Sequence, residues 1–141
     1  IDGFGAQDLA NTSWAFAKLG LMEDEMFDAI SGEVTKKVSS LIPQNLSIIS
    51  WAFAKLGLLN EVMMEAVAAE VLRRVAEFDG QGIGNVLWSF AVLGLREYRE
   101  MAQALVERSL PMMGSLTAQE MSNVAWGLSM MGHTGPLRRF L

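Results

Sequence analysis

The side chains that could do chemistry in this chain are polar residues that return at a fixed spacing. One column holds the amides Asn11, Asn85 and Asn123, with Ile48 in its remaining position. A column three residues earlier varies more, and its members are Asp8, Asn45, Gly82 and Glu120. Basic residues recur as well: Lys18, Lys55, Lys36, Lys37, Arg73 and Arg74. Amides donate and accept hydrogen bonds and basic side chains contact anions, so these residue types predict binding rather than catalysis.

Residues suited to catalysis or metal binding are scarce. The sequence has no cysteine and a single histidine, His133, which we expect in an exposed turn. It shows no nucleophile next to a base, no phosphate-binding glycine loop and no cluster of metal ligands. We therefore expect no enzyme activity, metal, cofactor or small-molecule substrate. Hydrophobic residues make up 51% of the chain, but no run of about 18 apolar residues free of charge occurs, so no membrane span is expected.

A repeated block organises the chain. The sequence WAFAKLG at residues 14–20 returns unchanged at 51–57 and more loosely at 88–94 and 126–132. The four tryptophans are therefore 37, 37 and 38 residues apart. A fixed period of this size predicts stacked repeats, each of which contacts only its neighbours. The expected repeats cover 5–41, 42–78, 79–116 and, in part, 117–141. They form a single array, which we expect to be a fragment of a longer solenoid because neither end resembles a polar capping repeat.

Each repeat is predicted to be a pair of antiparallel helices, so the fold class is all-α and the architecture an α-solenoid. The first helix is expected near 6–19, 43–56, 80–93 and 118–131, with a cap residue before it and a glycine after it. The second helix has acidic or Asn residues at its start and basic residues at its end, as the helix dipole favours. The third of these second helices is expected at about 96–109. Glu33 with Lys37, and Glu70 with Arg74, have the spacing of helical ion pairs.

The predicted core follows from the apolar columns of the first helix. These hold, relative to each tryptophan, Leu five residues before, the Trp itself, Phe two residues after and Leu five residues after, as in Leu9, Trp14, Phe16 and Leu19. We interpret all four tryptophans as core residues because they recur so strictly. On that interpretation Trp51→Ala would destabilise the fold by about 3–5 kcal/mol.

The repeat resembles a known kind of helical repeat. The blocks DGQGIGNVLWSFAVLG at 79–94 and QDLANTSWAFAKLG at 7–20 are similar to the octotricopeptide repeat of algal organelle proteins. They are also similar to the heptatricopeptide repeats found with RAP domains, in proteins that include the FAST kinase-like group. The Leu, Asn, Trp, Ala, Leu and Gly positions coincide, and the resemblance covers the whole chain. It implies an α-solenoid that binds single-stranded RNA in mitochondria or chloroplasts and acts on transcript stability, processing, splicing or translation.

The resemblance also implies where RNA would be contacted. Base readers would be polar residues of the first helices, from the columns of Asn11, Asn85 and Asn123 and of Asp8, Asn45 and Glu120. The first column could instead hold neighbouring repeats together, and the second could cap the helices. The uniform Gln column (Gln7, Gln44, Gln81 and Gln119) is interpreted as structural. The six basic residues could contact successive phosphates, or could only complement helix dipoles.

Two other functions stay open. The net charge of -5 by itself favours a protein–protein interaction scaffold, because nucleic-acid binders usually present a basic surface. A regulatory arm of a larger enzyme is the third. The charge arrangement separates the first two: basic residues lining one continuous groove would favour RNA, whereas an acidic or apolar surface on the first helices would favour the scaffold.

Overall fold

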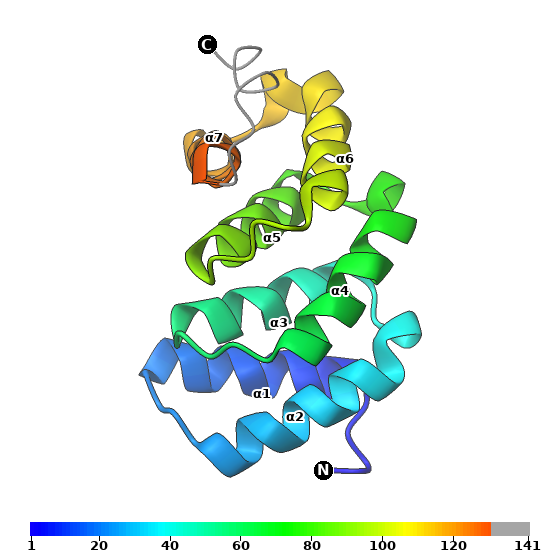
Figure 1. Cartoon of the computed structure of the whole chain (residues 1–141), viewed down its shortest axis with the longest axis vertical. Helices are drawn as coiled ribbons and strands as arrows, with labels where there is room; N and C mark the ends of the chain where they lie inside the picture. The colour runs from blue at the N-terminus through cyan, green and yellow to red at the C-terminus, as the bar shows by residue number, and fades with distance from the viewer. Residues whose placement is uncertain (131–141) are drawn as a thin grey trace.

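The computed structural model describes residues 1–130, which form two layers of helices (Figure 1). The first layer consists of α1 (Ala6–Leu19), α3 (Pro43–Lys55), α5 (Gly80–Val92) and α7 (Ala118–Met130). The second consists of α2 (Asp24–Lys37), α4 (Glu61–Arg73) and α6 (Arg99–Ser109). Each second-layer helix continues into a short 3-10 helix, and these are η1 (Val38–Ser40), η2 (Val75–Glu77) and η3 (Leu110–Ser115). The described residues contain no strand, and the predicted all-α solenoid is confirmed.

The first-layer helices begin and end close to the predicted positions because local residues set their ends. Gly20, Gly57 and Gly94 follow α1, α3 and α5 with φ of 69°, 68° and 72°, the left-handed conformation that glycine adopts at least cost. At the start of α5, the Asp79 side chain accepts a hydrogen bond of 2.8 Å from the backbone N–H of Gly82. The predicted fourth helix-ending glycine, Gly132, and the predicted turn at His133 lie outside the described residues.

One second-layer helix starts later than its pattern indicates. α6 was expected from about 96 but begins at Arg99. The backbone N–H of Arg96 donates to the carbonyl of Gly94 in a turn, and Leu95 is buried. The Tyr98 ring packs edge-on against Phe90, with 5.4 Å between ring centroids. Tertiary packing therefore holds residues 95–98 outside the helix, although the local sequence pattern alone places 96–98 in it.

The core lies between the two layers and runs along the whole stack. α1 packs on α3, α3 on α5 and α5 on α7, while α2 packs on α4 and α4 on α6. Phe27 of α2 meets Phe53 of α3 edge-on at 5.2 Å between centroids, and Leu9, Leu46 and Ile83 are fully buried. Of the helices within residues 1–130, none combines the length and apolar character needed to cross a membrane.

The prediction that the tryptophans belong to the core is wrong. Trp14 and Trp126 are 47% and 42% exposed, and Trp51 and Trp88 are half-buried. At 3.6 residues per turn, the five residues from Leu9 to Trp14 rotate the helix by about 140°, whereas the seven from Leu9 to Phe16 return it to nearly the same direction. The tryptophans therefore point away from the helix face that carries Leu9 and Phe16. Since the Trp51 ring is half-buried, we expect Trp51→Ala to cost less than the about 3–5 kcal/mol that a fully buried ring implied.

Candidate functional site

Each first-layer helix presents one stripe of polar and aromatic side chains to solvent. In α1 the stripe runs through Gln7, Asn11, Trp14 and Lys18, at steps of four, three and four residues that return to the same helix face. The Gln7 side-chain N–H donates to the Asn11 side-chain oxygen at 2.9 Å. The Lys18 ammonium lies 5.8 Å from the centroid of the Trp14 ring, within reach of a cation–π interaction. The stripe thus consists of two interacting pairs on one helix face, Gln7 with Asn11 and Trp14 with Lys18.

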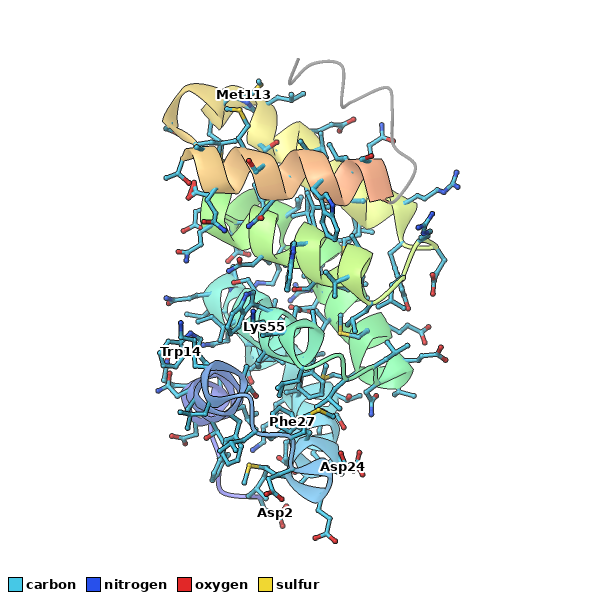
Figure 2. The ribbon with its side chains drawn as sticks, turned by 90° about the vertical axis from the view of Figure 1, so that its left-hand side faces the viewer. Asp2, Trp14, Asp24, Phe27, Lys55 and Met113 are labelled. Atoms are coloured by element: carbon cyan, nitrogen blue, oxygen red, sulfur yellow. The ribbon has the colours of Figure 1, made fainter. Side chains whose placement is uncertain are left out.

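Four such stripes lie side by side because the four helices pack in sequence order. We call the resulting surface the tryptophan face. Its residues are Gln7, Asn11, Trp14, Lys18, Gln44, Ile48, Trp51, Lys55, Gln81, Asn85, Trp88, Val92, Gln119, Asn123 and Trp126. All of them are exposed or half-buried. Trp14 on α1 and Lys55 on the neighbouring α3 mark this layer in Figure 2.

Two hollows open between neighbouring tryptophans of this face. The first hollow, of about 250 Å³, lies between Trp14 and Trp51, and its other lining residues are Lys18, Ile48, Gln81 and Asn85. The second hollow, of about 520 Å³, lies between Trp51 and Trp88, and its other lining residues are Lys55, Gln81, Asn85, Thr117, Gln119, Glu120 and Asn123. Each hollow therefore combines indole rings, side-chain amides and one lysine.

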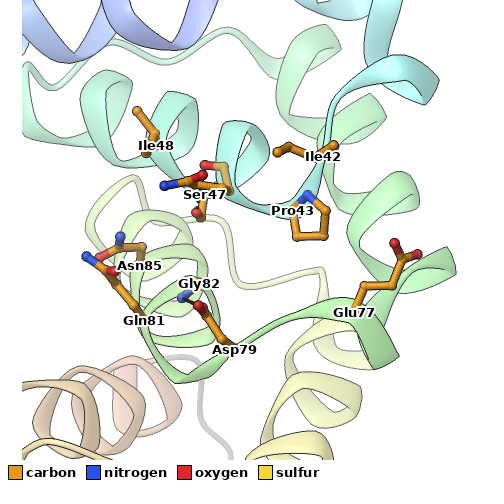
Figure 3. A pocket seen from close by; sticks show the side chains of 10 residues that line it. Ile42, Pro43, Ser47, Ile48, Glu77, Asp79, Gln81, Gly82 and Asn85 are labelled. Atoms are coloured by element: carbon orange, nitrogen blue, oxygen red, sulfur yellow. Dashed lines mark hydrogen bonds between the residues drawn. The ribbon is translucent and has the colours of Figure 1, made fainter. Parts of the chain in front are cut away.

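A third hollow, of about 390 Å³, adjoins these two where α3 and α5 begin. In Figure 3, Gln81 and Asn85 project from α5, with Ile48 across from them on α3. Glu77 and Asp79 line the same hollow. The tryptophan face is therefore bordered by two carboxylates near the start of α5, and it carries its lysines, Lys18 and Lys55, in the last turn of α1 and α3.

The structure brings two of the three predicted amides together. Asn85 and Asn123 both line the second hollow, and Asn11 lies exposed on α1, bonded to Gln7. No hydrogen bond within residues 1–130 joins any of these three side chains to the backbone of a neighbouring repeat. The geometry thus offers no support for the alternative in which the Asn column holds the stack together. The uniform Gln column lies on the same face, so it is not confined to the interior.

The more variable column caps the helices. Asp8 accepts a hydrogen bond from the Gly5 backbone N–H at 3.0 Å, Asn45 from that of Ile42 at 3.3 Å and Glu120 from that of Thr117 at 3.3 Å. Asn45 is only 3% exposed, so a partner on the surface would not reach it. Among these three residues, Glu120 is the one that also lines a hollow of the tryptophan face.

The six basic residues do not form the continuous groove that would have favoured RNA on charge alone. Lys18 and Lys55 lie on the tryptophan face, but the other four end the second-layer helices, near the opposite end of each antiparallel pair. Lys37 donates to the Phe4 carbonyl at 2.6 Å, Arg74 donates to the Leu41 carbonyl, and Arg108 donates to the Phe78 carbonyl at 3.3 Å. These bonds tie the end of each second helix to the chain entering the first helix of the same repeat.

The same basic residues are paired with carboxylates. Glu33 lies 3.0 Å from both Lys36 and Lys37, and Glu70 pairs with Arg73 and, at 3.8 Å, with Arg74. The predicted i,i+4 ion pairs are confirmed. Both glutamates are buried, and a buried carboxylate needs such partners. Lys36, Lys37, Arg73 and Arg74 therefore have a structural task already.

These pairs predict a pH effect on stability. The Lys37 ammonium, 3.0 Å from one Glu33 carboxylate oxygen, and then Lys36 hold the pKa of Glu33 below its ordinary value of 4.5, so this carboxylate stabilises the fold above that pH and loses its contribution as pH falls through the lowered pKa. Glu33→Gln is expected to lower stability at neutral pH and to flatten the loss of stability below about pH 4.5. Denaturant midpoints at neutral and acidic pH measure both effects. Glu25→Gln, at an exposed position of the same helix, is the control and should leave the acid-induced loss unchanged.

The residues that the sequence-based prediction left out of the site are the tryptophans, the Gln column and Thr117. Among the described residues, no three His, Asp or Glu side chains come together in a way that could hold a metal ion. The family model that matches the chain is described as RNA-editing substrate-binding complex 6 protein, and it covers residues 1–134. The comparison with curated proteins gives no match. The family match agrees with the expected RNA association but does not extend to the octotricopeptide or heptatricopeptide families.

Proposed function

Since the chain belongs to the RNA-editing substrate-binding complex 6 protein family, we propose that it is an RNA-binding segment that holds single-stranded RNA on the tryptophan face. The observation that carries this proposal is the row of solvent-accessible tryptophans, each beside a lysine or an amide. Large aromatic residues are normally buried, so a contiguous row in which Trp14 and Trp126 are exposed and Trp51 and Trp88 half-buried indicates a binding surface. A base stacked on an aromatic side chain contributes about 1–3 kcal/mol to binding.

The charges of the face favour stacking over phosphate contact as the main source of affinity. Within residues 1–130, Lys18 and Lys55 are the lysines of this surface, and Val92 replaces them on α5. Two phosphate contacts to single-stranded RNA predict a slope of log K against log salt of about -1.4. Affinity should therefore fall only about sevenfold between about 50 and about 200 mM salt. The net charge of -5 is compatible with such shallow dependence.

Titration of labelled single-stranded RNA by fluorescence anisotropy at these two salt concentrations tests the proposal. The expected result is saturable binding with the shallow slope, and weak competition by duplex RNA, whose bases are already stacked and paired. Lys18→Gln with Lys55→Gln should bring the slope close to zero. Lys36→Gln, at a position paired with Glu33, is the matched control and should leave the slope unchanged. Absence of binding at both salt concentrations by the folded protein would contradict the proposal.

We place the RNA-binding activity in the mitochondrion, in RNA processing, and without a catalytic step of its own. The family description supports an RNA-editing role and lends no support to the chloroplast. A protein-interaction scaffold is the alternative, and the net charge favours it. That alternative predicts no RNA binding in the titration above, so the same experiment decides between the two.

A further inference from the structure

We propose that the second hollow, between Trp51 and Trp88, selects nucleobases that carry an exocyclic amino group over uracil, whereas the first hollow accepts any base. This inference rests on the proposed function and refines it to the level of single subsites. The two hollows share Gln81 and Asn85, but only the second also receives a carboxylate and further polar groups from α7 and the residue before it.

The carboxylate in question is that of Glu120. Its Oε1 accepts a hydrogen bond of 3.3 Å from the Thr117 backbone N–H, while the Thr117 hydroxyl oxygen accepts one of 3.1 Å from the Glu120 backbone N–H. This reciprocal pair fixes the side chain in the first turn of α7. Within residues 1–130, Oε2 makes no hydrogen bond, so one carboxylate oxygen is available to a ligand. An ionised carboxylate only accepts hydrogen bonds.

The approach of α7 to this hollow depends on glycines at the start of α5. A Cβ at position 80 would lie 2.8 Å from Glu120 Oε1 and 2.5 Å from a Leu116 methyl carbon. A Cβ at position 84 would lie 3.3 Å from that of Asn123. The corresponding positions of the first two repeats are Ala6 and Ala10, and Pro43 and Ser47. The glycines of α5 therefore allow Glu120 and Asn123 of α7 to approach closely. The first two repeats have larger residues at these positions.

The hydrogen-bonding groups on the edges of the bases determine which base this hollow prefers. Adenine and cytosine present an amino group, which donates to a carboxylate, and a Glu or Asp side chain recognises cytosine in this way. Uracil presents a carbonyl oxygen at the position where cytosine has its amino group. That oxygen would face the Glu120 carboxylate, and two acceptors cannot bond to each other. The amides of Asn85 and Asn123 complete the recognition, because each can donate to a ring nitrogen or a carbonyl.

The first hollow has Asn85 but neither Glu120 nor Asn123. Helix α3 contributes Ile48 at the position where α5 and α7 contribute Asn, and no carboxylate lines this hollow. Its volume is about 250 Å³ against about 520 Å³ for the second. A base can stack on Trp14 and Trp51 while Lys18 contacts the RNA backbone. Neither contact requires a particular base edge. Selectivity should therefore come from the second hollow alone.

Oligo(C) and oligo(U) of equal length give the decisive comparison, because their bases have the same ring size and differ mainly in the edge that Glu120 would meet. The protein is expected to bind oligo(C) at least about fivefold more tightly than oligo(U), the ratio that corresponds to about 1 kcal/mol. Oligo(A) should also bind more tightly than oligo(U). Anisotropy titrations at one salt concentration measure all three.

Glu120→Gln tests the assigned residue. Glutamine also serves in a capping box, but its amide can donate to the uracil carbonyl, so oligo(C) and oligo(U) should then bind within about twofold of each other. Asp8→Asn, in the same column of α1 and also at a capping position, is the matched control and should keep the selectivity. Asn123→Ala is a second variant that should reduce the selectivity without touching the cap.

The outcomes separate the two levels of the proposal. Equal binding of oligo(C) and oligo(U) by the unmodified protein, or selectivity that survives both Glu120→Gln and Asn123→Ala, would overturn the subsite assignment and leave RNA binding intact. Failure of the folded protein to bind any of the oligonucleotides would overturn the proposed function and the subsite together. Circular dichroism of each variant confirms that the helices are present.

Discussion

Replacing Trp51 and Trp88 together by alanine is expected to weaken binding of single-stranded RNA by at least about 30-fold, since each stacked base contributes about 1–3 kcal/mol. The two rings flank the second hollow, so the double variant removes both stacking surfaces of that subsite. The rings are half-buried at the surface of the first layer, and the helices that carry them keep their core contacts. Anisotropy titration with one labelled oligonucleotide measures the loss.

The matched control for this variant is Val62→Ala. Val62 lies on the second-layer helix α4, outside the tryptophan face, and is 67% exposed, so its truncation should leave RNA affinity within about twofold of the unmodified protein. Unchanged affinity in Trp51→Ala/Trp88→Ala, with the fold retained, would mean that the tryptophans do not contact RNA.

The largest effect on stability is expected from Phe53→Ala, at about 3–5 kcal/mol. The ring is 2% exposed and packs edge-on against Phe27 at 5.2 Å between centroids. Its removal opens a cavity between the two layers. Because each repeat of a solenoid is stabilised by its neighbours, the loss should spread to the adjoining repeats. Urea denaturation followed by circular dichroism gives the change in the free energy of unfolding.

Trp14→Ala provides the comparison for this second prediction. Trp14 sits nearly half in solvent, so its truncation should cost much less than that of Phe53. If Trp14→Ala lowered the free energy of unfolding as much as Phe53→Ala or more, Trp14 would be a core residue. That result would contradict its assignment to the tryptophan face.

Helix ends and the period of the repeat are predictable because they depend on nearby residues. The glycines that end α1, α3 and α5 adopt the left-handed conformation that their position requires, and Asp79 caps α5 through a bond to Gly82, only three residues away. The side on which the tryptophans lie was predictable too. Counting 100° per residue separates Trp14 from the line of Leu9 and Phe16 and joins it to Gln7, Asn11 and Lys18. The tryptophans were wrongly assigned to the core because they are large, apolar and strictly recurrent, whereas their angular position on the helix indicates the opposite side.

Other features depend on contacts between distant parts of the chain. Lys37 and Arg74 find backbone carbonyls 33 residues away, which a reading of local helix dipoles does not anticipate. The second hollow exists because α7 approaches the glycine-rich start of α5, and the spacing of Glu120 along its own helix gives no sign of this. The period of the repeat therefore predicts the two layers and the polar stripes. Which of the polar residues come together in one hollow is known only from the packed structure.

The most direct test of the account is the intrinsic tryptophan fluorescence of the protein during titration with single-stranded RNA. Stacking of bases on the indoles should quench the fluorescence, and the quenching should saturate over the same RNA concentrations as the anisotropy of labelled RNA. Trp51→Ala/Trp88→Ala should lose most of both signals. Saturable RNA binding by anisotropy with no change in tryptophan fluorescence would contradict the claim that the tryptophan face is where the RNA lies.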